Sequence, residues 1–205
     1  MKPGPRIVAR AALVLLPATA HAHLVNTGLG PFYDGVSHFG LTPEDLLPAL
    51  ALALLAGQRG AGTGRTVLFA LPGAWLVGGL GGLAGIVSPS IAAGGPFGTI
   101  LTTVSFILLG GLVAAEAHLG RGWLAGFAVV VGLLHGALNG AAMARANLGA
   151  LGLAGIVTTL FVVVALAAAL VVAIRVAWGR IAVRVAGSWI AAIGLLLLGW
   201  SLRAR

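Results

Sequence analysis

Apolar stretches fill most of the chain after residue 22, and short segments rich in glycine, proline and arginine separate them. This pattern predicts six helices, at residues 43–58, 66–88, 97–117, 123–143, 149–174 and 183–202. Six membrane spans place both ends of the helical domain on the same side of a membrane. We therefore expect an all-α membrane protein, a bundle of six transmembrane helices after an N-terminal signal peptide.

The composition agrees with this class. Of the 205 residues, 60% are hydrophobic and only 8% are charged, whereas a soluble domain usually carries about 25% charged residues. So few charges could not cover an apolar core with a hydrated surface, which excludes a cytosolic enzyme and a disordered protein. We expect an integral membrane protein that contacts the lipid bilayer and has no enzymatic activity.

The net charge is +8, from 12 Lys and Arg against 4 Asp and Glu. Because the positive residues are mostly single arginines between apolar runs, they form no patch for a phosphate backbone, and no nucleic acid is expected as a partner. Arginine instead marks the cytoplasmic loops of membrane proteins. With the loops after the first, third and fifth spans inside, the cytoplasmic arginines are Arg59, Arg65, Arg121, Arg175, Arg180 and Arg184. The opposite side then holds only Arg145, Arg203 and Arg205.

The N-terminus has the pattern of a secretory signal. Three basic residues among the first ten precede a short apolar run at residues 11–16, and two overlapping A-x-A cleavage sites follow at 18–20 and 20–22. We expect residues 1–22 to be a cleavable signal peptide and residues 23–205 to be the six-helix transmembrane domain. The mature N-terminus would then lie in the periplasm, with the protein in the bacterial inner membrane.

Cleavage at either site leaves a histidine at or near the mature N-terminus. The chain would begin at His21 or at His23, and an N-terminal histidine chelates metals through its α-amine and imidazole. Cleavage after Ala20 also makes His23 the third residue, a position suited to binding Cu(II) or Ni(II) with backbone nitrogens. The alternative is that small residues happened to end the signal next to a histidine.

Glycine is frequent, with 33 residues, and much of it lies at helical spacing. Small residues four apart let helix backbones approach closely in lipid, where burial from water no longer drives association. The series are Gly78 with Gly82, Gly81 with Gly85, and Gly132 with Gly136 and Gly140. Tryptophans at predicted span ends or loops are typical of the membrane interface; these are Trp75, Trp123, Trp178 and Trp200.

The first predicted span is short and starts with two acids. Residues 46–58 are uncharged, and as a helix they reach only about 20 Å of the ~30 Å hydrocarbon core. Either this helix is a half-span that begins inside the bundle, or the span extends back through the acids. Both options bring Glu44 and Asp45 to the membrane edge or below it.

These acids have two interpretations. Thr42 followed by proline and two carboxylates resembles a helix start, where such side chains accept backbone N–H bonds. Two adjacent carboxylates at membrane depth are nevertheless costly. His38 lies six residues before Glu44, and one imidazole beside Glu44 and Asp45 could bind a hard or borderline divalent cation or take part in proton movement.

The fourth predicted span carries a second polar pair, His135 and Asn139, which share one helical face because they are four residues apart. Polar side chains in a membrane helix face the bundle interior or a cavity. The pair is therefore either an interhelical hydrogen bond or a pair of ligands on a cation path. The chain has no cysteine, so thiolate ligands are excluded.

Both polar segments resemble signatures of the HupE/UreJ family, hydrogenase- and urease-associated membrane proteins that are regarded as nickel permeases. Residues 38–55 are similar to the first-span signature, a His, five residues, then Asp-His and a leucine-rich helix. Residues 135–140 are similar to the second signature, His-Gly-x-Ala-His-Gly. Here Glu44 stands at the family's Asp position, whereas Asp45 and Asn139 stand where the family has histidines. Carboxylate and amide oxygens suit harder ions than imidazole does.

The resemblance implies an inner-membrane permease for a divalent transition metal, nickel or cobalt, that supplies metalloenzyme maturation. In this interpretation His38, Glu44 and Asp45 form an outward-facing site at a helix start, His135 and Asn139 face it, and His23 captures metal beforehand. The ion is cargo, and no tightly bound cofactor is expected. A homo-oligomer or metalloenzyme accessory proteins are the candidate partners.

Two other functions stay open from the sequence. One is a non-transporting membrane scaffold or accessory protein in hydrogenase or urease assembly. The other is a proton-coupled transporter of a small solute, with Glu44 or Asp45 as the proton carrier.

Overall fold

The computed structural model describes residues 26–88, 91 and 96–203, and within these residues it is helical without any strand. The predicted signal peptide and His23 lie outside the described residues, so both stay predictions. The helices are α2 (Pro31–Leu41), α3 (Pro43–Gln58), α4 (Ala61–Leu83), α6 (Pro96–Ala114), α7 (Arg121–Arg145), α8 (Gly149–Ala173) and α9 (Ala177–Arg203). The all-α class is confirmed.

Four helices, α4, α7, α8 and α9, are long and apolar enough to cross a membrane. Together, α2 and α3 are also long and apolar enough to form one span, broken by a bend of 72°. The part of α6 from Gly98 to Ala114 is apolar but shorter. Several helices therefore have the length and composition of membrane spans, whereas the count of six spans stays a prediction.

The helix α2 was not expected from the sequence. Its first turn contains Pro31, whose missing N–H costs nothing there. The buried Asp34 fixes the preceding segment, since its Oδ1 accepts hydrogen bonds of 2.7 Å from both the backbone N–H and the hydroxyl of Thr27. The helix ends at Leu41. Thr42 after it is extended, and its hydroxyl donates to the carbonyl of His38 at 2.6 Å. The first predicted span is thus a half-span, α3, that follows a sharp bend.

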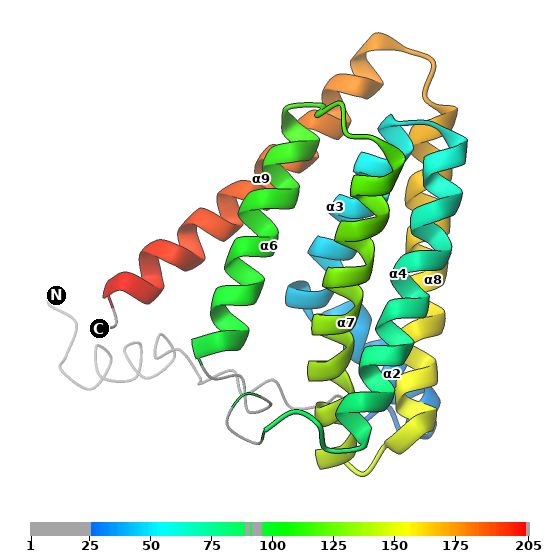
Figure 1. The fold of residues 1–205 in the computed structure, drawn as a ribbon, viewed down its shortest axis with the longest axis vertical. Helices are drawn as coiled ribbons and strands as arrows, with labels where there is room; N and C mark the ends of the chain where they lie inside the picture. The colour runs from blue at the N-terminus through cyan, green and yellow to red at the C-terminus, as the bar shows by residue number, and fades with distance from the viewer. Residues whose placement is uncertain (1–25, 89–90, 92–95, 204–205) are drawn as a thin grey trace, which may run out of the picture.

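The half-span α3 is the central helix of the bundle (Figure 1). It packs against α8, α6, α4 and α2, and residues 51–57 are all buried. A helix that is apolar on every side must be enclosed by others, and the sequence of alanines and leucines in α3 meets this condition. In its first turn Asp45 is buried, whereas Pro43 and Glu44 are exposed.

Glycines allow α4 and α7 to touch backbone to backbone. A Cβ at Gly78 or Gly82 would overlap carbonyls of α7, and a Cβ at Gly136 or Gly140 would overlap the carbonyls of Trp75 and Gly79 in α4. The predicted close approach is confirmed for these positions. It is wrong for Gly81 with Gly85, because Gly85 lies beyond the end of α4 with φ of 78° and open space around it.

Two further helix pairs use the same device. Gly35 of α2 contacts Gly152 of α8, and Gly110 of α6 contacts Gly187 of α9, with no room for a Cβ at either contact. In Figure 1, α6 and α9 lie together on one side of α3, whereas α4 and α8 lie on the other and α7 runs in front of α3. The bundle therefore consists of tightly joined pairs arranged around α3.

The α4–α7 contact gives a direct test. Gly140→Ala places a methyl group against the backbone of Gly79, so we expect it to destabilise the fold by about 1–3 kcal/mol, as overpacking does. Gly126→Ala on the same helix meets no atom within 4 Å and serves as the matched control. The measurement is the thermal unfolding midpoint of each purified protein in detergent. Equal midpoints for the two variants would contradict the contact.

Candidate functional site

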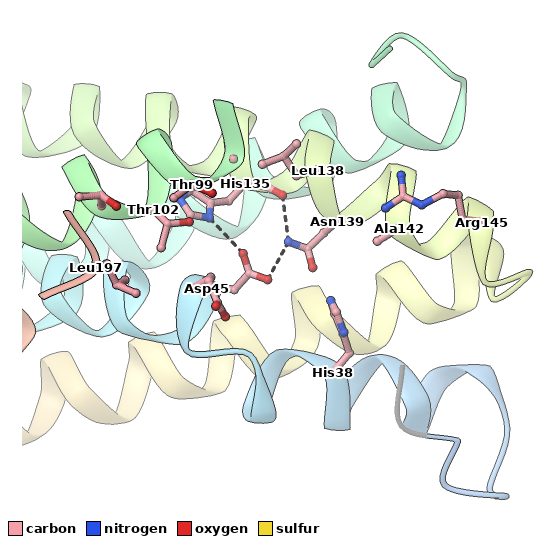
Figure 2. Close-up of a pocket in the computed structure, with 13 residues that line it drawn as sticks. His38, Asp45, Thr99, Thr102, His135, Leu138, Asn139, Ala142, Arg145 and Leu197 are labelled. Carbon is pink, nitrogen blue, oxygen red and sulfur yellow. Dashed lines mark hydrogen bonds and ion pairs between the residues drawn. The ribbon is translucent and has the colours of Figure 1, made fainter. Parts of the chain in front are cut away.

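Asp45 links α3 to α7 inside the bundle. Its side chain lies in the first turn of α3 and is 6% exposed. The carboxylate does not cap its own helix, because α7 uses both oxygens: His135 donates from Nδ1 to Oδ1 at 3.0 Å, and Asn139 donates from Nδ2 to Oδ2 at 2.9 Å (Figure 2). The two polar segments, 90 residues apart in sequence, therefore meet in space.

The interpretation of residues 42–45 as a helix start is correct for the backbone only. Thr42 is the N-cap residue of α3 and a proline follows it in the first turn, as predicted. No side chain caps the helix, since the Thr42 hydroxyl bonds back to α2 and the Asp45 carboxylate bonds to α7. The polar side chains that the sequence suggested as helix caps thus form hydrogen bonds with neighbouring helices instead.

His135 and Asn139 share one face of α7 and are both almost fully buried, at 2% and 3% exposure. The Asn139 amide donates a second hydrogen bond, of 3.0 Å, to the carbonyl of His135. Both amide hydrogens are therefore used, which fixes the orientation of the side chain. The predicted interhelical hydrogen bond exists, and its partner is Asp45.

Trp75 packs against the other side of this cluster. Its ring is stacked on the His135 imidazole with centroids 5.5 Å apart and an interplanar angle of 29°, and the side chain is fully buried. The expectation of an interfacial position is wrong for Trp75, because the glycines of α7 draw this part of α4 into the core. The other three tryptophans named in the sequence analysis are strongly exposed.

Two polar atoms of the cluster have no hydrogen-bond partner, Nε2 of His135 and Oδ1 of Asn139, and both are buried. When Nδ1 of a neutral His135 donates to Asp45, Nε2 carries a lone pair, as the amide oxygen also does. The cluster therefore presents one nitrogen and one oxygen electron-pair donor that the protein itself does not satisfy. Buried polar atoms are rarely left in this state.

These residues line a cavity of about 360 Å³. His38, Glu44 and Asp45 line it from α2 and α3, and His135 and Asn139 line it from α7. His38 is half-buried and points from α2 toward Asn139, as Figure 2 shows, whereas Glu44 is exposed. Five of the six predicted metal residues therefore share one cavity, and the sixth, His23, lies outside the described residues.

Within the part of the chain that the structure describes, no three His, Cys, Asp or Glu side chains are grouped so as to hold a metal ion. The polar atoms are instead distributed over α2, α3, α6 and α7. Metal binding by the five residues stays a prediction.

Sequence reasoning missed the contribution of α6. Thr99, Thr102 and Thr103 line the cavity, and their spacing of three and four residues puts them on one helix face. Threonines at this spacing in an apolar helix were the sequence feature that could have indicated a polar face on α6. Arg145, at the end of α7, also lines the cavity, whereas the sequence analysis uses it only to assign the side of the membrane.

The helices and the polar cavity define a multi-pass membrane protein. The family model described as HupE / UreJ protein matches residues 11–197, nearly the whole chain. The chain therefore belongs to the HupE/UreJ family, which is associated with nickel or cobalt uptake or with urease and hydrogenase maturation. No curated protein and no solved structure gives a significant match.

Removal of the central carboxylate should destabilise the protein even without metal. Asp45→Ala leaves the donors of His135 and Asn139 without their acceptor, and each buried unpaired group costs about 1–3 kcal/mol. Glu44→Ala, one residue away and exposed, should change stability by no more than about 0.5 kcal/mol. Thermal unfolding of the chelator-treated proteins measures the difference. A midpoint for Asp45→Ala equal to that of Glu44→Ala would show that the hydrogen bonds do not support the fold.

Proposed function

We propose that the protein is an inner-membrane permease for a divalent transition-metal ion, nickel or cobalt, that supplies metalloenzyme maturation. The observation that carries this proposal is the shared cavity, in which Nε2 of His135 and Oδ1 of Asn139, two electron-pair donors, have no hydrogen-bond partner. Membership of the HupE/UreJ family supports the class of cargo. Imidazole nitrogen with amide oxygen is a ligand combination that borderline ions such as Ni²⁺ and Co²⁺ accept.

The hydrogen bonds indicate different roles for the residues. His135 binds the ion through Nε2, and Asn139 binds it through Oδ1. Asp45 is a positioning residue, because metal-binding histidines commonly donate their other N–H to a carboxylate that fixes the ring. His38 and Glu44 receive the ion at the more exposed part of the cavity. Such a site binds weakly, and a transported ion must be able to leave.

The arginine distribution supports an outward-facing cavity. The connections between α3 and α4, α6 and α7, and α8 and α9 lie at one end of the bundle (Figure 1). Arg59, Arg121 and Arg175 lie at these connections, and the positive-inside rule places this end in the cytoplasm. Asp45 lies at the opposite end of α3, so the cavity faces the periplasm in this orientation.

Radioactive nickel uptake in cells without their own nickel importers tests the proposal. We expect uptake above the empty-vector control, and we expect His135→Ala to reduce it to the vector level because the nitrogen donor is lost. His118→Ala is the matched control, since His118 is exposed and does not line the cavity. Asp45→Asn should lower nickel affinity by about 10- to 100-fold through misorientation of His135.

Immunoblots of the membrane fraction control for the amount of each variant, and cobalt and manganese serve as competitors. Absence of uptake from well-expressed wild type would reject a nickel permease and favour the scaffold function. Flux of another solute that depends on pH and ignores divalent metals would favour the proton-coupled transporter.

A further inference from the structure

The threonines of α6 form a polar wall of the cavity. Thr102 and Thr103 are 8% and 4% exposed, and Thr99 lies on the same helix face one turn earlier. In Figure 2, Thr99 and Thr102 lie at the end of the cavity where the His135 ring lies, and His38 lies at the other end. The hydroxyl face of α6 therefore borders the cavity on the side of the histidine.

The Thr103 hydroxyl differs from those of Thr66 in α4, Thr159 in α8 and Ser188 in α9. The hydroxyls of Thr66, Thr159 and Ser188 each donate to the carbonyl four residues earlier, at 2.9 to 3.2 Å. This bond is the usual way in which a membrane helix satisfies a hydroxyl. The buried hydroxyl of Thr103 has no hydrogen-bond partner. An unpaired hydroxyl among apolar helices is costly, and the cavity is where a partner for it can come from.

We propose that Thr103, with Thr102 beside it, binds the transported cation through its hydroxyl oxygen, so that α6 completes the site that α7 begins. This inference rests on the permease function proposed above. Three unsatisfied atoms then have one common partner: Nε2 of His135, Oδ1 of Asn139 and Oγ1 of Thr103. The ion binds by exchanging water molecules of its hydration shell for these atoms, without any covalent or redox step.

The donor set defines the class of ion. One imidazole nitrogen with two or more neutral oxygens, and no sulfur, suits Ni²⁺, Co²⁺ and Mn²⁺ and disfavours Cu(I), which prefers thiolate and thioether ligands. The threonine oxygens carry no charge, so they add less to the affinity than carboxylates would, and the ion can still dissociate. Mn²⁺ depends on oxygen ligands more than Ni²⁺ does. The hydroxyls of α6 therefore determine how strongly the site discriminates between these ions.

The test uses the purified full-length chain in detergent, with Ni²⁺ and Mn²⁺ titrations followed by the shift in thermal unfolding. Thr103→Val removes the oxygen at almost constant shape, and Thr103→Ser keeps the oxygen. Thr159→Val on α8 is the matched control, because its hydroxyl is bonded to Gly155 and lies outside the cavity. All variants are measured with and without metal.

We expect Thr103→Val to lower the apparent Ni²⁺ affinity about tenfold, on the scale of a lost metal-site interaction, and to lower the Mn²⁺ affinity further. Without metal, its unfolding midpoint should equal or exceed that of wild type, because the substitution removes an unpaired polar group. Thr103→Ser and Thr159→Val should bind metal as wild type does. A merely structural role for Thr103 would lower the metal-free midpoint instead and would overturn the inference.

The inference and the proposed function fail in different ways. If wild type binds and transports nickel, and Thr103→Val binds Ni²⁺ and Mn²⁺ with the same affinities as wild type, only the proposed role of α6 is wrong. If wild type binds no divalent ion and moves none in cells, the permease function is rejected together with this inference.

Discussion

Asp45 is a carboxylate inside an apolar bundle, and the helix opposite satisfies both of its oxygens. His135 and Asn139 donate to it from one face of α7, which fixes where α3 begins relative to α7. The same two hydrogen bonds determine which atoms of the imidazole and the amide remain without partners. The stability of the fold and the orientation of the His135 and Asn139 side chains therefore both depend on Asp45. A substitution of Asp45 affects both.

Close packing of α4 and α7 supports this arrangement from behind. Gly136 and Gly140 directly follow His135 and Asn139 in α7. Because an α-helix has 3.6 residues per turn, each glycine lies roughly 100° around the helix from its polar neighbour. One face of α7 can thus contact the backbone of α4 while the neighbouring face carries the polar pair. The contact also brings Trp75 onto the imidazole, which shields it from lipid on that side.

The sequence was sufficient for what depends on local periodicity. Apolar runs predicted the long helices, with ends that differ by up to six residues from those of α4 and α9, and the spacing of His135 and Asn139 predicted their common face. The helix α2 was missed because its 11 residues include Asp34, His38 and two glycines, which break the apolar pattern. That the two clusters meet depends on the bend after α2 and on contacts between distant segments. Thr103 could not be distinguished from a threonine bonded to its own helix until the backbone was known.

The bend between α2 and α3 also has an electrostatic consequence. Because Glu44 and Asp45 of its first turn line the cavity, the N-terminus of α3 lies beside it and carries the positive end of the helix dipole, equivalent to about half an elementary charge. This partial charge repels a cation, while Glu44 and Asp45 in the same turn attract it. The half charge of the dipole offsets only part of the charge of the two carboxylates, so the bend weakens the negative potential at this end of the cavity.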